Sequence, residues 1–183
     1  PRQRPWFQGA TSRYKQMQTV PDLFTSAEGI HWTPPYTFFT TQEPGITAAV
    51  VYEDTGSVTR VIGLDILLSD ISKFTTSLSI SSNGMVTVLT EDNRLVGLPR
   101  YGPFTDPATW RNALLKHPEE LNLALASDAG HAFDARPVGD TTPIRFTSDG
   151  EVWWAQGRAF ALTKDAHLNI AVLIPESDLL TDV

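Results

Sequence analysis

The chain has 183 residues, of which 41% are hydrophobic, so it is long enough and apolar enough to bury a core. Its net charge of −7 argues against a nucleic-acid-binding groove, which carries a basic stripe. The absence of cysteine excludes disulfides, thiolate metal sites and cysteine nucleophiles. No apolar run approaches the roughly 20 residues of a membrane span. Because the chain also lacks an initiating Met and a leader, we expect a soluble piece of a longer protein.

Residues 1–45 are rich in proline and aromatic residues and show little apolar periodicity. Proline fixes φ and donates no backbone hydrogen bond, so we expect mostly loops here. The exceptions are a short helix around Ser12–Gln18 and a strand near Tyr36–Thr40. So many aromatic residues in irregular chain fit either a rigid loop core or a ligand pocket.

Two units of hairpin and helix follow. The first has strands at Ile46–Tyr52 and Val58–Ile66, a turn ending at Gly56, and an amphipathic helix at Leu67–Leu78. The second unit has helices near Pro107, with Asp106 as N-cap, at Glu119–Ser127, and after Pro175, capped by Ser177 or Asp178. Its expected strands are Met85–Leu89, Arg94–Leu98, Pro143–Thr147, Val152–Leu162 and His167–Ile174. This order predicts an α+β, PAS-like fold: an antiparallel five-stranded sheet with helices on one side.

Six segments, in this order, carry a family resemblance: Arg4–Phe7, Trp32–Tyr36, Gly45–Thr47, Val61–Ile66 with the helix after it, Gly84–Leu98 and Val172–Leu179. Together they resemble the double Cache (tandem PAS-like) extracytoplasmic sensor domains of bacterial transmembrane receptors. In that family a long helix and further strands precede the segment matched by Arg4–Phe7. The resemblance therefore implies that residues 1–80 are the C-terminal part of a membrane-distal Cache domain, and that 81–183 are a nearly complete membrane-proximal one. The distal sheet would then have an open edge with unpaired backbone groups.

The resemblance also implies a ligand site in the distal domain, made by Arg4, Trp6, Phe7, Tyr36 and Asp65. Arginine offers a planar fork of donors suited to a carboxylate, and aspartate offers acceptors for an ammonium group. Amino-acid-binding members of the family usually have Tyr where this chain has Phe7. Phenylalanine donates no hydrogen bond, so an amino acid, a simpler carboxylate, an amine and no ligand at all remain open.

Each of these residues also has a structural interpretation. Arg4 would pair with a nearby carboxylate, Asp65 would cap the following helix or accept bonds in a turn, and Trp6 and Trp32 would fill the core. In the second unit, Trp153 and Trp154 are adjacent in one expected strand, so one should face the core and the other the opposite side.

The sequence offers no catalytic apparatus. It contains no Gly-x-Ser-x-Gly and no phosphate-binding glycine loop, and its four histidines are scattered. Asp128, His131 and Asp134 lie in a small, polar stretch that we expect to be a loop rather than a metal site. We therefore expect neither enzymatic activity, nor a metal, nor a cofactor.

These observations favour an extracytoplasmic ligand-sensing input domain, in the periplasmic part of an inner-membrane receptor. A small molecule would bind it and shift the helix after Pro175. We expect the full receptor to be a membrane-anchored homodimer without nucleic-acid partners, and a histidine kinase, a cyclase, a phosphodiesterase or a chemoreceptor as its output. The alternative is a non-catalytic protein-interaction module that contacts a periplasmic partner.

Overall fold

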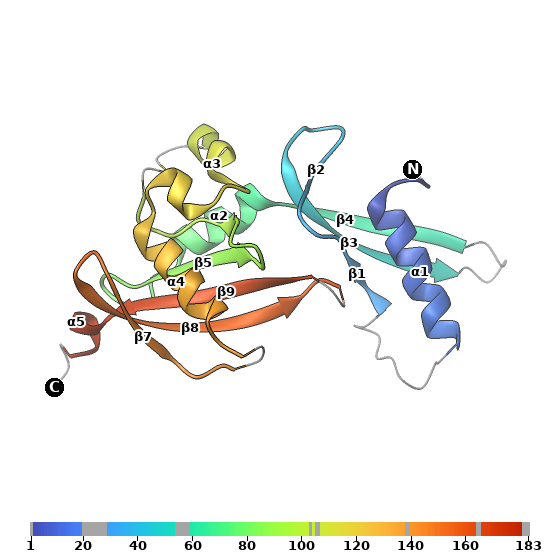
Figure 1. Ribbon diagram of the computed structural model, residues 1–183. Helices are drawn as coiled ribbons and strands as arrows, with labels where there is room; N and C mark the ends of the chain where they lie inside the picture. Colours follow the sequence, from blue (N-terminus) through green and yellow to red (C-terminus); the bar gives the residue numbers. More distant parts are fainter. Residues whose placement is uncertain are drawn as a thin grey trace. The chain divides into compact units, whose positions relative to one another are not determined.

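The structure, a computed structural model, describes residues 2–19, 29–53, 59–102, 104, 107–137, 140–163 and 166–180. The chain divides into two compact units: unit 1 is residues 1–67 with 162–166, and unit 2 is residues 68–161 with 167–183. Each unit has an antiparallel sheet, with α1 packed on that of unit 1 and several helices in unit 2 (Figure 1). The assignment of residues 1–80 and 81–183 to a distal and a proximal Cache domain stays a prediction. None of the helices in the described ranges combines the length and the apolar character that crossing a bilayer requires.

Unit 1 is built around one long central strand. Its elements are α1 (Pro5–Thr19), β1 (His31–Trp32), β2 (Tyr36–Thr37), β3 (Pro44–Glu53) and β4 (Thr59–Leu67). The central strand β3 pairs with β4 along its whole length on one side, and with the short strands β1 and β2 on the other. Both long strands confirm the predicted hairpin within one or two residues, although residues 54–58 between them lie outside the described part.

Helix α1 is longer than the predicted Ser12–Gln18, because it begins at Pro5. The first helical position tolerates proline, whose missing N–H would have no partner there in any case. Trp6, Ala10 and Tyr14 recur every four residues and therefore share one face. This face packs against Ala49, Val51 and Val61 of the sheet. The prediction of irregular chain around Trp6 was therefore wrong: the aromatic residues belong to a packed helix.

The other face of the β3–β4 hairpin is apolar and exposed. Val50 lies opposite Ile62 in the register, and Ala48 lies opposite Leu64. Ile62 is 58% exposed and Leu64 is 64% exposed. Since side chains alternate across a strand, the covered residues Ala49 and Val51 and these exposed ones belong to opposite faces of the same hairpin.

Unit 2 contains the predicted five-stranded antiparallel sheet, in the order β6-β5-β9-β8-β7. Its strands confirm all five expected ones. The elements are α2 (Leu68–Ser77), β5 (Met85–Thr90), β6 (Leu95–Gly97), α3 (Pro107–Ala113), a 3-10 helix (Pro118–Leu121), α4 (Ala124–Asp134), β7 (Ile144–Ser148), β8 (Glu151–Ala161), β9 (His167–Pro175) and α5 (Glu176–Leu179).

The core of unit 2 lies between α4 and the sheet, which α4 crosses in Figure 1. Trp153 is 7% exposed and belongs to this core, whereas Trp154 faces the opposite side and is half-buried. The predicted alternation of the two tryptophans is therefore confirmed. The buried cluster under α4 consists of Met85, Ala129, Trp153, Ala155, Ala171 and Leu173.

Four local predictions in unit 2 need correction or fall outside the described residues. The stretch with Asp128, His131 and Asp134 is helix α4 and not a loop, because Leu125, Ala129 and Phe133 form a helical face that packs on the core of the sheet. The expected helix Glu119–Ser127 is instead a 3-10 turn and the start of α4, separated where Asn122 takes a positive φ of 54°. Helix α5 is preceded by Pro175 without a side-chain cap, so Ser177 and Asp178 lie within it. The expected N-cap Asp106 lies outside the described residues.

Candidate ligand-binding site

A chain of hydrogen bonds links three polar side chains on one face of the sheet of unit 1. The hydroxyl of Tyr36 lies 2.7 Å from Oγ1 of Thr47, and Thr47 donates to Oδ1 of Asp65 over 2.6 Å. Strand pairing explains this arrangement, because Thr47 and Asp65 are directly opposite in the β3–β4 register. Thr47 is 1% exposed, whereas Asp65 reaches solvent. These hydrogen bonds therefore connect the buried layer with the surface.

Trp6 lies over the same face. A Cβ built on Gly63 would be 3.4 Å from the Trp6 ring and 3.4 Å from Cγ2 of Thr47, so these groups surround Gly63. Gly63 precedes Asp65 by two residues and thus shares its face of β4. The structure consequently brings together three of the five predicted site residues: Trp6, Tyr36 and Asp65.

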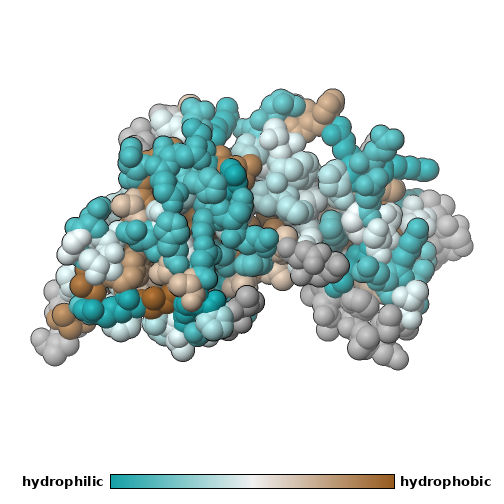
Figure 2. Space-filling model, viewed as in Figure 1, coloured by the Kyte–Doolittle hydropathy of each residue, from teal (hydrophilic) through white to brown (hydrophobic). Residues whose placement is uncertain are grey.

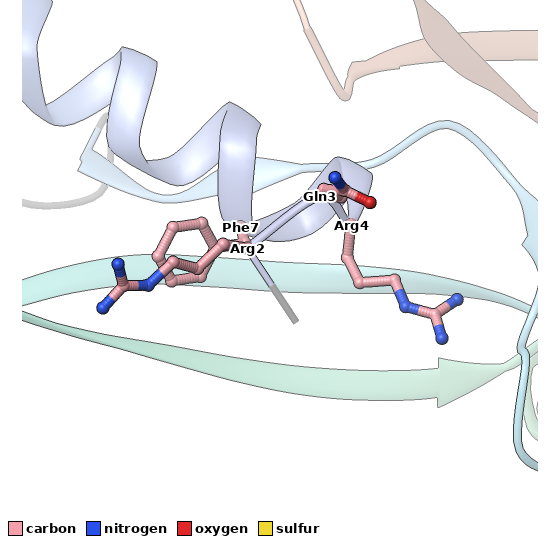
Figure 3. A pocket seen from close by; sticks show the side chains of 4 residues that line it. All are labelled: Arg2, Gln3, Arg4 and Phe7. Carbon is pink, nitrogen blue, oxygen red and sulfur yellow. The ribbon is translucent and has the colours of Figure 1, made fainter.

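Arg4 and Phe7 line an open pocket of about 780 Å³ at the start of α1, together with Arg2 and Gln3 (Figure 3). This volume is in the range of small-molecule sites. The guanidinium groups of Arg2 and Arg4 point away from each other in Figure 3. Arg4 therefore presents its donors on one side of the first helical turn, and Arg2 on the other.

Aromatic rings hold the two predicted residues at this pocket. Cζ of Arg4 lies 4.4 Å from the centroid of the Phe39 ring, a cation–π contact. Phe39 is 69% exposed in the turn between β2 and β3, where Figure 2 shows hydrophobic surface. The rings of Phe7 and Trp6 meet edge to face, with centroids 5.8 Å apart. Phe7 thus contributes an apolar wall without a hydroxyl.

Among the described residues, the ion pair expected for Arg4 and the helix cap expected for Asp65 are not seen, whereas Trp6 does pack in a core. The described part of the chain gives Arg4 no carboxylate partner, so the expected ion pair is not seen. Asp65 lies inside β4, three residues before α2 begins, and is not a helix cap. Trp6 packs against the small core of unit 1 and also lies over Gly63, so it contributes to packing whether or not it lines a ligand site.

Sequence reasoning missed Thr47, although it lies in the matched segment Gly45–Thr47. Its hydroxyl joins the two residues that were singled out, Tyr36 and Asp65. Alternation along the strand could have placed Thr47 on the covered face, but its position opposite Asp65 follows only from the β3–β4 register. Gly63, Phe39, Arg2 and Gln3 were also missed, because their contacts depend on how α1 packs on the sheet.

His31 fixes α1 near the site. A Cβ on Gly9 would lie 1.9 Å from Nε2 of His31, so only glycine lets the imidazole approach the helix this closely. Burial lowers the pKa of His31, and the neighbouring positive charge of Arg13 lowers it further. Both effects favour the neutral form of this histidine.

In unit 2, two carboxylates attach α5 to the rest of the unit. Glu176 accepts from Nε and Nη2 of Arg145, both over 2.9 Å, and from Nε1 of Trp154 over 3.2 Å. Asp178 accepts from the Ser81 hydroxyl over 2.6 Å and from the Asn83 backbone amide over 2.7 Å. These donors lower the pKa of both carboxyl groups, mainly through Arg145 for Glu176 and through Ser81 for Asp178.

A smaller pocket of about 350 Å³ lies beside α5 in unit 2. Its lining carries no charged side chain, so it does not offer the charge pair that the predicted ligand site needs. The lining consists of Pro143, Trp154, Ala155, Gln156, Val172, Ile174 and Leu179. Within the described residues, we find no cluster of three or more His, Asp or Glu side chains arranged for a metal ion.

Solved structures with the same fold are ligand-binding domains of bacterial chemoreceptors. The domain of Pseudomonas fluorescens CtaA, in complex with L-isoleucine, aligns with 100% of this chain at 17% identity and a TM-score of 0.57. That of Pseudomonas aeruginosa PAO1 PctB, in complex with L-Arg, aligns with 99% at 16% identity and a TM-score of 0.56. That of PctC from the same organism, in complex with GABA, aligns with 95% at 14% identity and a TM-score of 0.54.

The chain spans 61%, 63% and 62% of the length of these three domains. Comparisons with protein-family profiles and with curated protein sequences each gave no match. The predicted α+β fold is therefore confirmed, and it is the fold of these chemoreceptor domains.

Proposed function

We propose that this chain is the extracytoplasmic ligand-sensing region of a bacterial transmembrane receptor, and that it is not an enzyme. Unit 1 binds a small molecule that carries a carboxylate, an ammonium group or both. The ligand's carboxylate is bound by Arg4 and its ammonium group by Asp65, with Trp6, Phe7 and Tyr36 as walls. The receptor is membrane-anchored and dimeric, and the region described here faces the periplasm or the cell exterior.

The observation that carries this proposal is the hydrogen-bonded chain Tyr36–Thr47–Asp65 on the face that Trp6 covers. This hydrogen-bonded chain presents the Asp65 carboxylate on the same unit as Arg4. Arg4 lines an open pocket, and among the described residues its guanidinium has no carboxylate partner. A guanidinium and a carboxylate that are not paired with each other can each bind an oppositely charged group of one ligand. The chemoreceptor domains with this fold, solved with amino acids and GABA, support the same ligand class.

Helix α5 provides a route from the sensor to the rest of the receptor. It directly follows β9, and Glu176 and Asp178 bind it to β7, β8 and the segment before β5. A ligand shifts such a helix only if it binds two conformations with different affinity. We therefore expect ligand binding to change the environment of α5.

The test is a thermal-shift and calorimetric screen of the purified chain with L-amino acids, primary amines and small carboxylates. Arg4→Ala and Asp65→Asn should each weaken binding of the hits about tenfold to a hundredfold, because each removes a charge-assisted hydrogen bond. Arg100→Ala and Asp70→Asn are matched controls, since Arg100 also stacks on an aromatic ring and Asp70 is also exposed, both in unit 2. Hits that survive both site substitutions would move the site elsewhere. A chain that binds no probe would favour the protein-interaction alternative.

A further inference from the structure

Both hydrogen bonds in the Tyr36–Thr47–Asp65 chain are donated in the same direction, from Tyr36 toward Asp65. A carboxylate only accepts hydrogen bonds, so the proton of the Thr47 hydroxyl is the one shared with Asp65 over 2.6 Å. A hydroxyl has one proton, and that of Thr47 is thereby used. The 2.7 Å contact between Tyr36 and Thr47 must then be donated by Tyr36.

This direction determines what the chain offers to a ligand. The single proton of the Tyr36 hydroxyl points at Thr47, so its outward side carries only lone pairs. Asp65 likewise offers only lone pairs from both of its carboxylate oxygens. Two acceptors and no donor thus line this part of the site, an arrangement that suits an ammonium group with three donors and no acceptor.

We infer that Thr47 is a positioning residue of the proposed site, which orients Tyr36 and Asp65 as acceptors and so makes the site select ammonium groups over hydroxyl groups. The inference rests on the proposed function, because it assigns the selectivity of that same site. Thr47 itself is 1% exposed, so it acts through its two neighbours and does not touch the ligand.

The position of Thr47 is held independently of its hydroxyl. Its backbone amide donates to the Thr33 hydroxyl over 2.9 Å, and its carbonyl accepts from the Thr33 amide over 3.0 Å. Replacement by valine, which has the same shape, keeps these backbone bonds and the packing of Cγ2 against Gly63. Water can reach Asp65, which is exposed, and Tyr36, which is half-buried, so neither is left with an unsatisfied group.

The experiment compares matched amino and hydroxy ligands on wild type, Thr47→Val and Thr47→Ser. The probe pairs are L-alanine with L-lactate, L-leucine with 2-hydroxyisocaproate, and 4-aminobutyrate with 4-hydroxybutyrate, measured by calorimetry. Wild type and Thr47→Ser should prefer the amino member of any pair that binds by about tenfold or more. In Thr47→Val the Tyr36 proton is released to donate, so this preference should fall by about threefold to tenfold.

The ratio of affinities separates positioning from a structural role. A loss of stability alone would weaken the binding of both members of a pair equally and leave the preference for the amino member unchanged. That result would overturn the inference, while the proposed function would stand. Failure of the wild type to bind any of the six probes would overturn the proposed ligand class, and the inference with it. Thr47→Ser should restore the wild-type preference, because serine keeps the hydroxyl.

Discussion

The two units share an architecture, a helix across an antiparallel sheet, but they fill the space between helix and sheet differently. In unit 2 this layer holds bulky side chains such as Trp153, Met85 and Leu173. In unit 1 the corresponding face of β3 and β4 carries Thr47 and Ala49 opposite Asp65 and Gly63. Small and polar residues there place hydrogen-bonding groups beside the part of the face that α1 covers.

This difference assigns different roles to the two units. A layer filled by large apolar side chains fixes one geometry, because any change of volume is costly. A layer of glycine, alanine and hydrogen-bonded polar groups has fewer large apolar contacts and offers the polar groups by which a small ligand is oriented. On the proposed function, unit 2 would be the scaffold and unit 1 the binding unit. The following substitutions test this contrast, from the largest expected effect to the smallest.

Leu173→Ala should remove about 2–5 kcal/mol from the free energy of unfolding of unit 2, because Leu173 is completely buried in its core. Ile170→Ala, on the same strand but on the other face and 37% exposed, should cost about 1 kcal/mol. Urea unfolding followed by tryptophan fluorescence measures both. Equal losses would contradict the scaffold role of this core.

Two glycine substitutions compare the layers directly. Gly157→Ala should cost about 1–3 kcal/mol, because the new Cβ would lie 2.6 Å from the Phe133 ring. Gly63→Ala should change stability by less than about 0.5 kcal/mol, since its Cβ meets Trp6 and Thr47 at 3.4 Å. The alanine at 63 should nevertheless weaken ligand binding, as it fills space next to Trp6. A costly Gly63→Ala with unchanged binding would reverse the proposed contrast.

Much of the fold could be predicted from local patterns. Alternation and turn residues predicted both long strands of unit 1 and all five strands of unit 2, and the alternation of Trp153 and Trp154 was confirmed. These features depend on strand periodicity, which neighbouring residues define without reference to distant contacts. The order of strands and helices then pointed to the correct fold class.

The failures occurred where distant contacts decide. Helix α1 carries an apolar face at four-residue spacing, but the proline-rich surroundings of Trp6 favoured loops, and only packing on Ala49 and Val51 buries this face. Helix α4 contains Gly130, a poor helix former, and is stabilised by packing of Leu125, Ala129 and Phe133 on the sheet. At the site, Arg4 and Asp65 were named through a family resemblance, whereas Thr47 becomes recognisable only once the β3–β4 register is known.

Unit 1 should lose stability in mild acid because of His31. Burial lowers its pKa in the folded state, so below the ordinary histidine value of about 6.5 the unfolded chain binds the proton more readily than the folded one. Stability should thus be constant with respect to this group above about pH 6.5 and decrease as the pH falls from there. His31→Gln should remove this part of the decrease, as measured by urea unfolding at pH 5.5 and 7.5. An unchanged difference between the two pH values in the variant would contradict it.

The smallest effect concerns the attachment of α5 to the scaffold. Hydrogen bonds from Ser81 and Asn83 lower the pKa of Asp178, so this carboxylate stabilises the folded state above the pKa of the unfolded chain and loses that effect as the pH falls through the lower, folded pKa. The amide proton of Asn83, which donates to Asp178, should report this titration by NMR with a midpoint below the ordinary aspartate value. Asp178→Asn should abolish the titration, whereas Asp70→Asn, an exposed aspartate paired with Lys73, should leave it intact. Because α5 is the proposed output of the sensor, a ligand that acts on it should also shift the Asn83 signal, and a ligand that binds unit 1 without moving this signal would separate binding from relay.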